Sequence, residues 1–226
     1  MAKVLIIGAG IGGLAATIAL RQVGVEPMVF EWSGEMREIG AGITLWANAV
    51  KALKRLGVYD VVRAAGMAEI GGETRAWRGQ KIEIPKDELR VRFGEANLAV
   101  CLADLQGALL AALPEETVRL EAECVCFVQD GAGVVVRFAD GHEERGDTLI
   151  GADGINPSVR AQLFDRCEPR YAGYSGWRVR PGGHRTRELL LVPHQKRARE
   201  QPKARPGARK RSWISTEAGT RRRGWR

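Results

Sequence analysis

The stretch KVLIIGAGIGGLAATIAL, which starts at Lys3, constrains the fold more than any other part of the sequence. Its first part, Val4 to Ile7, is a continuous apolar run that ends at a glycine, as expected of a strand buried on both faces of a parallel sheet. Leu14 to Val23 has the apolar spacing of a helix, and Pro27 to Phe30 forms a second apolar strand. The order of strand, glycine turn, helix and strand predicts a βαβ unit.

The glycines of this unit have the spacing of a dinucleotide-binding loop. Gly8 permits a tight turn, and Gly10 lets the backbone approach a pyrophosphate. Gly13 allows close packing of helix and strand, and Gly12 belongs to the same predicted dinucleotide-binding loop. The helix that follows directs its free N–H groups at the phosphates. Glu31 ends the second strand, where a carboxylate can accept both hydroxyls of an adenosine ribose and disfavours a 2′-phosphate. The pattern predicts FAD or NAD rather than NADP; the alternative is a plain glycine turn with a solvated glutamate.

Predicted helices and strands continue to alternate up to about residue 178. Asn48 to Gly66 predicts two helices separated at Gly57, and Ala103 to Leu113 predicts a buried helix. Alternating residues around Gly79 predict a pair of exposed strands, and two Asp-Gly turns predict a β-meander over residues 117–148. Together with the βαβ unit, these segments indicate an α/β fold.

The positive charge of the chain is concentrated at its end. The formal net charge is +8, but residues 178–226 hold sixteen Lys/Arg against three Asp/Glu, so the preceding residues are net acidic. This tail is rich in Arg, Pro and Gly and has one short apolar patch, Leu189 to Val192, so disorder is expected from about residue 179. A nucleic-acid-binding arm is the alternative, but no folded recognition element accompanies these charges.

The remaining composition excludes several classes of protein. The cysteines lack the spacing of a zinc site or of a disulfide scaffold and are expected to be buried, reduced thiols: Cys101, Cys124, Cys126 and Cys167. The two-residue spacing of Cys124 and Cys126 predicts that both point to one face of a strand. No metal site is predicted, and the three histidines lie in turns or irregular sequence. Without a long apolar span or a signal peptide, a cytoplasmic protein that does not enter the membrane is expected.

Three ordered motifs in the first 178 residues resemble a known family. The stretches VFEWSGEMREIGAGITLWANAVKALKRLG, LIGADGINPSVR and YAGYSGWR are similar to segments of FAD-dependent aromatic-ring monooxygenases of the para-hydroxybenzoate and salicylate hydroxylase type. The resemblance implies FAD rather than NAD in the dinucleotide site. It also implies a Rossmann-like, glutathione-reductase-like FAD-binding domain with a β-meander and part of a strand-rich substrate domain.

The resemblance implies roles for further residues. Arg37 corresponds to an arginine near the phosphate and ribityl region of the flavin, although it could instead pair with a neighbouring glutamate at the surface. Gly42, with the two residues before it, would let the backbone pass close to the flavin ring. Val125 falls in the strand that lines the adenine. Asp153 and Gly154 would contribute to the sites of FAD and of passing NAD(P)H, whereas the alternative for Asp153 is an ordinary turn and helix cap.

The reaction implied by the resemblance is hydroxylation of an aromatic or similar small organic substrate. NAD(P)H would act as the co-substrate and O₂ as the oxygen source, while the protein supplies a dry, oriented pocket. This chemistry requires neither a protein nucleophile nor a metal. The alternative is a non-catalytic fragment or pseudoenzyme that binds FAD or another nucleotide.

The sequence departs from the family pattern in two places. Leu102 stands where the family has an arginine that contacts the flavin, and losing a charge-assisted hydrogen bond of that kind costs on the order of 1.5–3 kcal/mol. No third Gly-Asp fingerprint follows Trp177, which suggests a truncation or frameshift after about residue 178. The expected division is therefore a first FAD-binding part at 1–72, a partial substrate insertion at 73–100, a second FAD-binding part at 101–178 and a basic tail at 179–226.

Overall fold

The computed structural model describes eight stretches of the chain: residues 2–36, 42–68, 72–75, 79–84, 86–155, 158–164, 175–179 and 188–192. The chain forms two compact units, Met1–Glu168 and Pro169–Arg226. Each unit is described by itself. The predicted dinucleotide-binding residues all fall in the first unit.

A parallel sheet organises the first unit. β1 (Lys3–Ile7), α1 (Ile11–Gln22) and β2 (Glu26–Phe30) form the predicted βαβ unit. The sheet has the strand order β12-β1-β2-β8, in which β12 is Thr148–Gly151 and β8 is Val118–Arg119. All three pairings in this sheet are parallel. The predicted Rossmann-like α/β architecture is confirmed.

Both faces of this sheet are buried, which explains the unbroken apolar run of β1. Val4 and Ile6 belong to the apolar cluster that contains Leu14 and Ile18 of α1. The alternate residues of β1 belong to a second cluster, which contains Phe30 and residues of the meander. Successive side chains of a strand point to opposite faces, so two separate cores leave no position for a polar residue.

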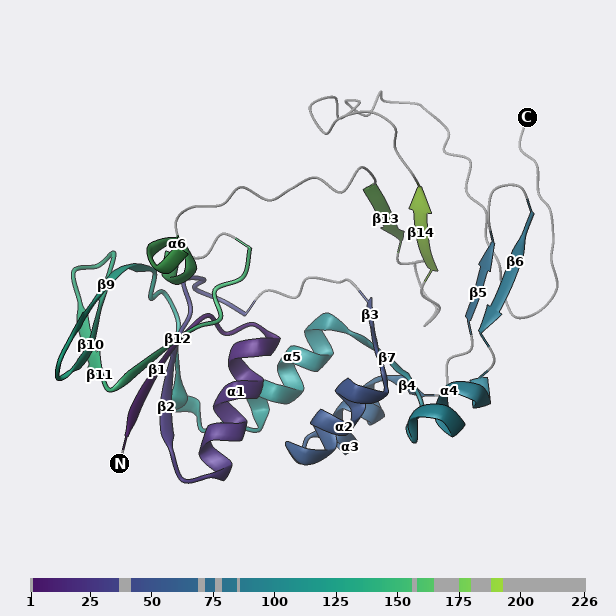
Figure 1. Ribbon diagram of the computed structural model, residues 1–226, viewed down its shortest axis with the longest axis horizontal. Helices are drawn as coiled ribbons and strands as arrows, with labels where there is room; N and C mark the ends of the chain where they lie inside the picture. The colour runs from purple at the N-terminus through teal and green to yellow at the C-terminus, as the bar shows by residue number, and fades with distance from the viewer. Residues whose placement is uncertain are drawn as a thin grey trace. The chain divides into compact units, whose positions relative to one another are not determined.

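Helices cover one face of the sheet. α1 packs against α5 (Leu102–Ala111), and α5 in turn packs against α3 (Tyr59–Ala65), as Figure 1 shows. α2 (Ala47–Arg55) precedes α3, and Gly57 separates them with a φ of +75°, as the sequence predicted. A positive φ is tolerated best by glycine, so the break is encoded locally.

The β-meander covers the other face. It consists of β9 (Cys124–Asp130), β10 (Gly133–Phe138) and β11 (Glu143–Gly146), paired antiparallel in the order β11-β10-β9. Gly141, in the turn between β10 and β11, has a φ of +83°. The predicted meander is confirmed, and its apolar residues form the second core with the sheet.

A bulge in β9 changes the environment of the cysteines. Phe138 pairs with Cys124 while Arg137 pairs with Cys126, so one residue of β9 is left without a counterpart. The simple alternation predicted for the two cysteines is interrupted, because Cys124 and Phe127 are buried whereas Cys126 is half-buried. The described cysteines are free thiols, and Cys167 lies outside the described residues.

The predicted strand-rich insertion contains strands and one unpredicted helix. β7 (Leu98–Cys101) lies at the end of the range predicted for the insertion, 73–100, and pairs antiparallel with β3 (Gly42–Leu45) and β4 (Met67–Ala68), which both precede that range. β5 (Gly72–Arg75) pairs with β6 (Lys81–Ile84) around Gly79, as predicted. The helix is α4 (Lys86–Phe93). The prediction missed it because its sequence has no apolar stripe, and Val91 is 86% exposed.

The second unit corrects the expectation of disorder from residue 179. β13 (Ser175–Val179) pairs antiparallel with β14 (Glu188–Val192). β14 contains the one apolar patch of the basic tail, and this patch supplies the residues that favour a strand. Nearly all the other residues of the predicted tail lie outside the described ranges.

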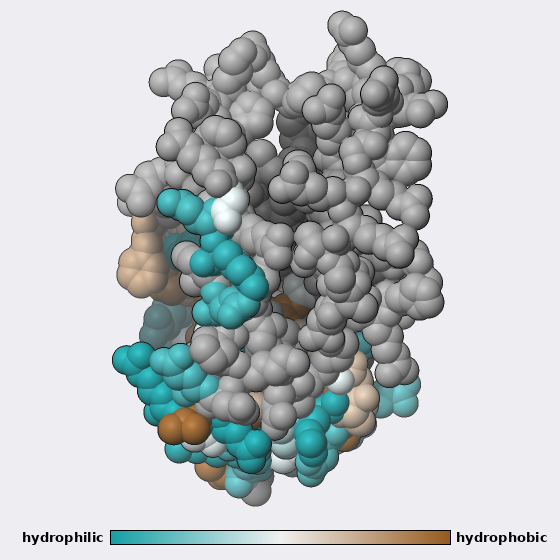
Figure 2. Space-filling view, turned by 90° about the vertical axis from the view of Figure 1, so that its right-hand side faces the viewer, coloured by the Kyte–Doolittle hydropathy of each residue, from teal (hydrophilic) through white to brown (hydrophobic). Residues whose placement is uncertain are grey.

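The surface of the described residues is mixed in character. On the face shown in Figure 2, hydrophilic side chains predominate among the coloured residues, with hydrophobic ones interspersed. Scattered apolar side chains are normal on protein surfaces. Across the described stretches, none of the helices combines the length and the apolarity needed to span a membrane.

Candidate functional site

The glycine loop joins the end of β1 to the start of α1. Gly8 has a φ of +106°, and a Cβ added to it would lie 2.4 Å from the Ala152 carbonyl oxygen. A Cβ added to Gly13 would lie 1.9 Å from the Gly8 carbonyl oxygen. Both distances are shorter than side-chain carbons adopt, so these two glycines are required by the fold itself. The geometry agrees with the predicted turn at Gly8 and the close helix packing at Gly13.

The other two loop glycines border open space. Apart from the adjacent residues and the backbone of α1 itself, a Cβ on Gly10 or on Gly12 would meet no atom of the described residues within 4 Å. Gly10 is the N-cap of α1, it makes no side-chain cap hydrogen bond, and the first turn of α1 contains no acidic residue. The N–H groups of the first turn lack partners within the helix, and the helix dipole makes this end positive. The loop can therefore accept an anion such as a pyrophosphate close to its backbone.

Glu31 connects β2 to this loop. Its Oε2 accepts a 2.8 Å hydrogen bond from the Ala9 N–H, and its Oε1 accepts a 3.1 Å hydrogen bond from the Ser33 N–H. The half-buried carboxylate is thus held beside the glycine loop rather than left in solvent. Each carboxylate oxygen has a second lone pair, so the group can still accept hydrogen bonds from two ribose hydroxyls.

Gln106 is a further residue of the candidate site, and it was not predicted from the sequence. This side chain of α5 donates a 3.0 Å hydrogen bond from Nε2 to the Ala9 carbonyl oxygen. Glu31, at the end of β2, and Gln106 of α5 therefore bind both backbone groups of Ala9. The only sequence signal was a polar residue in a helix, LADLQGALLA, that is apolar apart from this residue and Asp104.

The turn after β12 is the second part of the site. The Ala152 N–H donates to the Ile7 carbonyl oxygen at 2.7 Å, which places the turn beside Gly8. Asp153 accepts hydrogen bonds at its Oδ2 from the Val159 N–H at 3.0 Å and from the Ser158 hydroxyl at 3.3 Å. Asp153 therefore caps α6 (Ser158–Phe164), which is the role the sequence left open as the alternative to cofactor binding.

The remaining predicted site residues are placed as follows. Gly42 begins β3 and pairs with Cys101, which directly precedes Leu102 at the start of α5. The predicted flavin-side glycine and the leucine that replaces the family arginine are thus close in space. Val125 lies in β9 and is 58% exposed. Gly154 has a φ of +79° in the turn after β12, and Arg37 lies outside the described residues.

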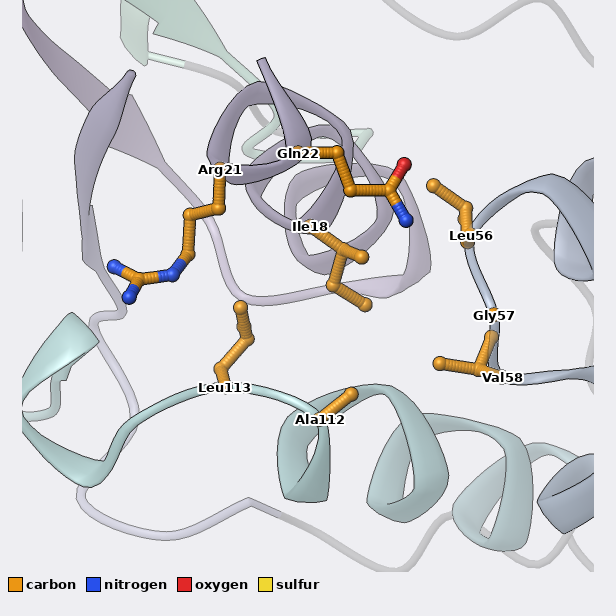
Figure 3. A pocket seen from close by; sticks show the side chains of 8 residues that line it. All are labelled: Ile18, Arg21, Gln22, Leu56, Gly57, Val58, Ala112 and Leu113. Atoms are coloured by element: carbon orange, nitrogen blue, oxygen red, sulfur yellow. The ribbon is translucent and has the colours of Figure 1, made fainter. Parts of the chain in front are cut away.

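A groove of about 310 Å³ lies at the opposite end of α1 from the glycine loop. Its walls come from the C-terminal ends of α1 and α5 and from the loop between α2 and α3. Figure 3 shows Ile18, Val58 and Leu113 directed toward the middle of the groove, whereas the guanidinium of Arg21 points away from it. None of the predicted dinucleotide-binding residues lines this groove, so it has no part in the candidate site.

Comparisons with known proteins identify relatives of the whole N-terminal region. A family described as FAD binding domain matches residues 1–171. The chain is 39% identical over 176 residues to aurachin C monooxygenase/isomerase of Stigmatella aurantiaca, a match that covers 77% of this chain and 46% of that protein. It is 34% identical over 181 residues to 6-hydroxynicotinate 3-monooxygenase of Pseudomonas fluorescens, covering 78% and 47% respectively.

A solved structure shows the same architecture. The crystal structure of Klebsiella pneumoniae HpxO complexed with FAD and uric acid matches with a TM-score of 0.71 and 33% identity, covering 78% of this chain and 46% of that one. The chain spans less than half the length of each of these three relatives. The family match includes the glycine loop, Glu31 and the turn after β12. The predicted resemblance to FAD-dependent aromatic-ring monooxygenases is confirmed, and the chain belongs to the FAD-binding domain family.

Proposed function

We propose that this chain binds FAD and forms the N-terminal part of a monooxygenase that hydroxylates an aromatic or similar small organic substrate with NAD(P)H and O₂. The relatives support the reaction class, because two of them are named as monooxygenases. The observation that carries FAD binding is the open space beside Gly10 at the N-terminus of α1. A dinucleotide fits there because the first-turn N–H groups of α1 lack partners within the helix and, among the described residues, a Cβ added to Gly10 meets open space.

Different residues of the site would bind different parts of the cofactor. The glycine loop of Gly8, Gly10, Gly12 and Gly13 would hold the pyrophosphate, and Glu31 would accept hydrogen bonds from the adenosine ribose. Gly42, Val125, Asp153, Gly154 and Arg37 remain proposed contacts. When bound, the flavin supplies the redox chemistry that couples NAD(P)H to O₂. The protein's own contribution is to bind the cofactor, orient it and exclude water.

The first test is whether the purified protein retains FAD. Its visible absorbance is recorded before and after incubation with FAD and desalting, and we expect the bands of oxidised flavin to remain with the protein. Retention supports the proposed function, and NAD(P)H oxidation with candidate aromatic acids then measures turnover. A protein that stays colourless after incubation would contradict FAD binding by this chain.

Replacing Leu102 with arginine is expected to tighten FAD binding. The change restores a guanidinium at the start of α5, next to the Gly42 end of β3. A charge-assisted hydrogen bond contributes about 1.5–3 kcal/mol, so the dissociation constant should fall about tenfold or more. Flavin fluorescence titration measures it. Leu102→Gln is the matched control without charge, and equal affinities for both variants would contradict the role of the guanidinium.

A non-catalytic FAD-binding protein is the second candidate, and Leu102 is the observation that favours it. A leucine at this position cannot hydrogen-bond to the flavin, so FAD could be held without the geometry that turnover requires. The two functions differ in one measurement. Flavin that stays bound but is not reduced by NADH or NADPH under anaerobic conditions indicates the non-catalytic protein.

A further inference from the structure

Three attachments of α6 to other segments bear on the candidate site; a further hydrogen bond, from the Arg160 guanidinium to the Ile155 carbonyl oxygen, also joins α6 to the turn after β12. Asp153 caps its first turn. Val159 is buried against Gly151 of β12, where an added Cβ would lie 2.9 Å from the valine side chain. The third attachment is Gln162, whose side chain reaches β9.

Gln162 binds both backbone groups of a single residue in β9. The Phe127 N–H donates to its Oε1 at 3.0 Å, and its Nε2 donates to the Phe127 carbonyl oxygen at 2.5 Å. Among the described strands, β9 pairs with β10 alone and is therefore an edge strand of the meander. The amide of Gln162 therefore continues the hydrogen-bonding pattern of the sheet for one residue and joins α6 to the meander.

Gln162 is linked to the candidate dinucleotide site through α6 on one side and through β9 on the other. The α6 helix that Gln162 holds begins at the cap formed by Asp153. Asp153 follows Ala152, whose carbonyl oxygen lies against Gly8. β9 also carries Val125, two residues before Phe127. A change in the placement of α6 therefore reaches both the turn beside Gly8 and the strand proposed to line the adenine.

We propose that Gln162 is a positioning residue for the dinucleotide site, because its two hydrogen bonds to Phe127 hold α6 and β9 in the arrangement that places the Asp153–Gly154 turn beside the glycine loop. The inference rests on the proposed FAD binding. Gln162 itself touches neither the glycine loop nor Glu31 through any of the hydrogen bonds found in the described residues.

The test uses two variants of the full chain. Gln162→Met keeps the length of the side chain but removes both hydrogen bonds. Gln162→Glu keeps an acceptor for the Phe127 N–H but loses the donor to its carbonyl oxygen while the carboxyl group is ionised. Both are expected to weaken FAD binding about three- to tenfold at pH 7.5, in line with the modest net contribution of such hydrogen bonds.

The pH dependence distinguishes positioning from general packing. A protonated carboxyl group can accept from the Phe127 N–H and donate to its carbonyl oxygen, as the amide does. The Phe127 carbonyl oxygen can accept a hydrogen bond only from the protonated carboxyl group, so FAD affinity of Gln162→Glu should recover as the pH falls toward about 5, whereas Gln162→Met should not recover. Cys124 and Cys126 of β9, Asp153 at the cap of α6 and Arg160 of α6 are titratable or charged groups on the segments that Gln162 joins, and wild-type protein carries the same four and controls for them.

Hydrogen exchange at the Phe127 amide reports the attachment without FAD. We expect faster exchange in both variants and a pH-dependent return only in Gln162→Glu, with Gln129→Met as the control on an exposed residue of β9. Faster exchange with unchanged FAD affinity would overturn the positioning role. Equal loss of affinity in both variants at every pH would also overturn it. If wild-type protein binds no FAD, the proposed function fails first and this inference with it.

Discussion

Gly13→Ala is expected to destabilise the first unit strongly. The added Cβ would lie 1.9 Å from the Gly8 carbonyl oxygen, and that oxygen is backbone that cannot rotate away. α1 must then move from β1, which disturbs the cluster formed by Leu14, Ile18 and the sheet. Overpacking of this kind costs about 3 kcal/mol or more, equivalent to a fall in melting temperature of roughly 6–12 °C.

Gly12→Ala is the matched control for this prediction. It adds the same methyl group one residue earlier in the same helix, where no protein atom lies within 4 Å. Alanine is also the better helix former by about 1 kcal/mol, so the melting temperature should stay equal or rise. Thermal unfolding followed by circular dichroism measures both variants. A similar loss of stability in the two would contradict the packing role assigned to Gly13.

Gly10→Ala is expected to separate FAD binding from folding. Gly10 has a φ of −69° and a ψ of 178°, which alanine adopts without strain, and its added Cβ meets no protein atom. Loss of glycine at an N-cap costs about 1 kcal/mol or less. The methyl group would instead enter the space proposed for the pyrophosphate. A steric conflict with a closely packed ligand costs about 1–3 kcal/mol, which would weaken FAD binding about five- to 150-fold.

FAD titration and thermal unfolding of the same Gly10→Ala sample measure the two effects together. The expected result is a nearly unchanged melting temperature without FAD and a strongly raised dissociation constant. Gly24→Ala is not a suitable control, because Gly24 has a φ of +79° and alanine would be strained there. Gly107→Ala is suitable, because Gly107 lies in α5 and its added Cβ also meets open space. Wild-type affinity in Gly10→Ala would contradict the proposed path of the pyrophosphate.

Much of the fold could be predicted because it depends on neighbouring residues. The apolar run of β1, the break at Gly57 and the hairpin around Gly79 are local patterns, and each appears in the structure where the sequence placed it. α4 and β14 were missed for a shared reason. Each carries a short or weak signal that only pairing or packing with other segments completes.

The sequence by itself determined where the chain turns and where apolar side chains recur, because backbone conformation and side-chain periodicity depend on only a few neighbouring residues. It also determined the family, through motifs that remain in order along the chain. Only the tertiary structure decided that Gln106 holds Ala9, that Asp153 caps α6 and that Gln162 closes the edge of β9. Two of these contacts, those of Gln106 and Gln162, join segments far apart in the sequence, where the packing of helices on the sheet, rather than local preference, sets which polar groups meet.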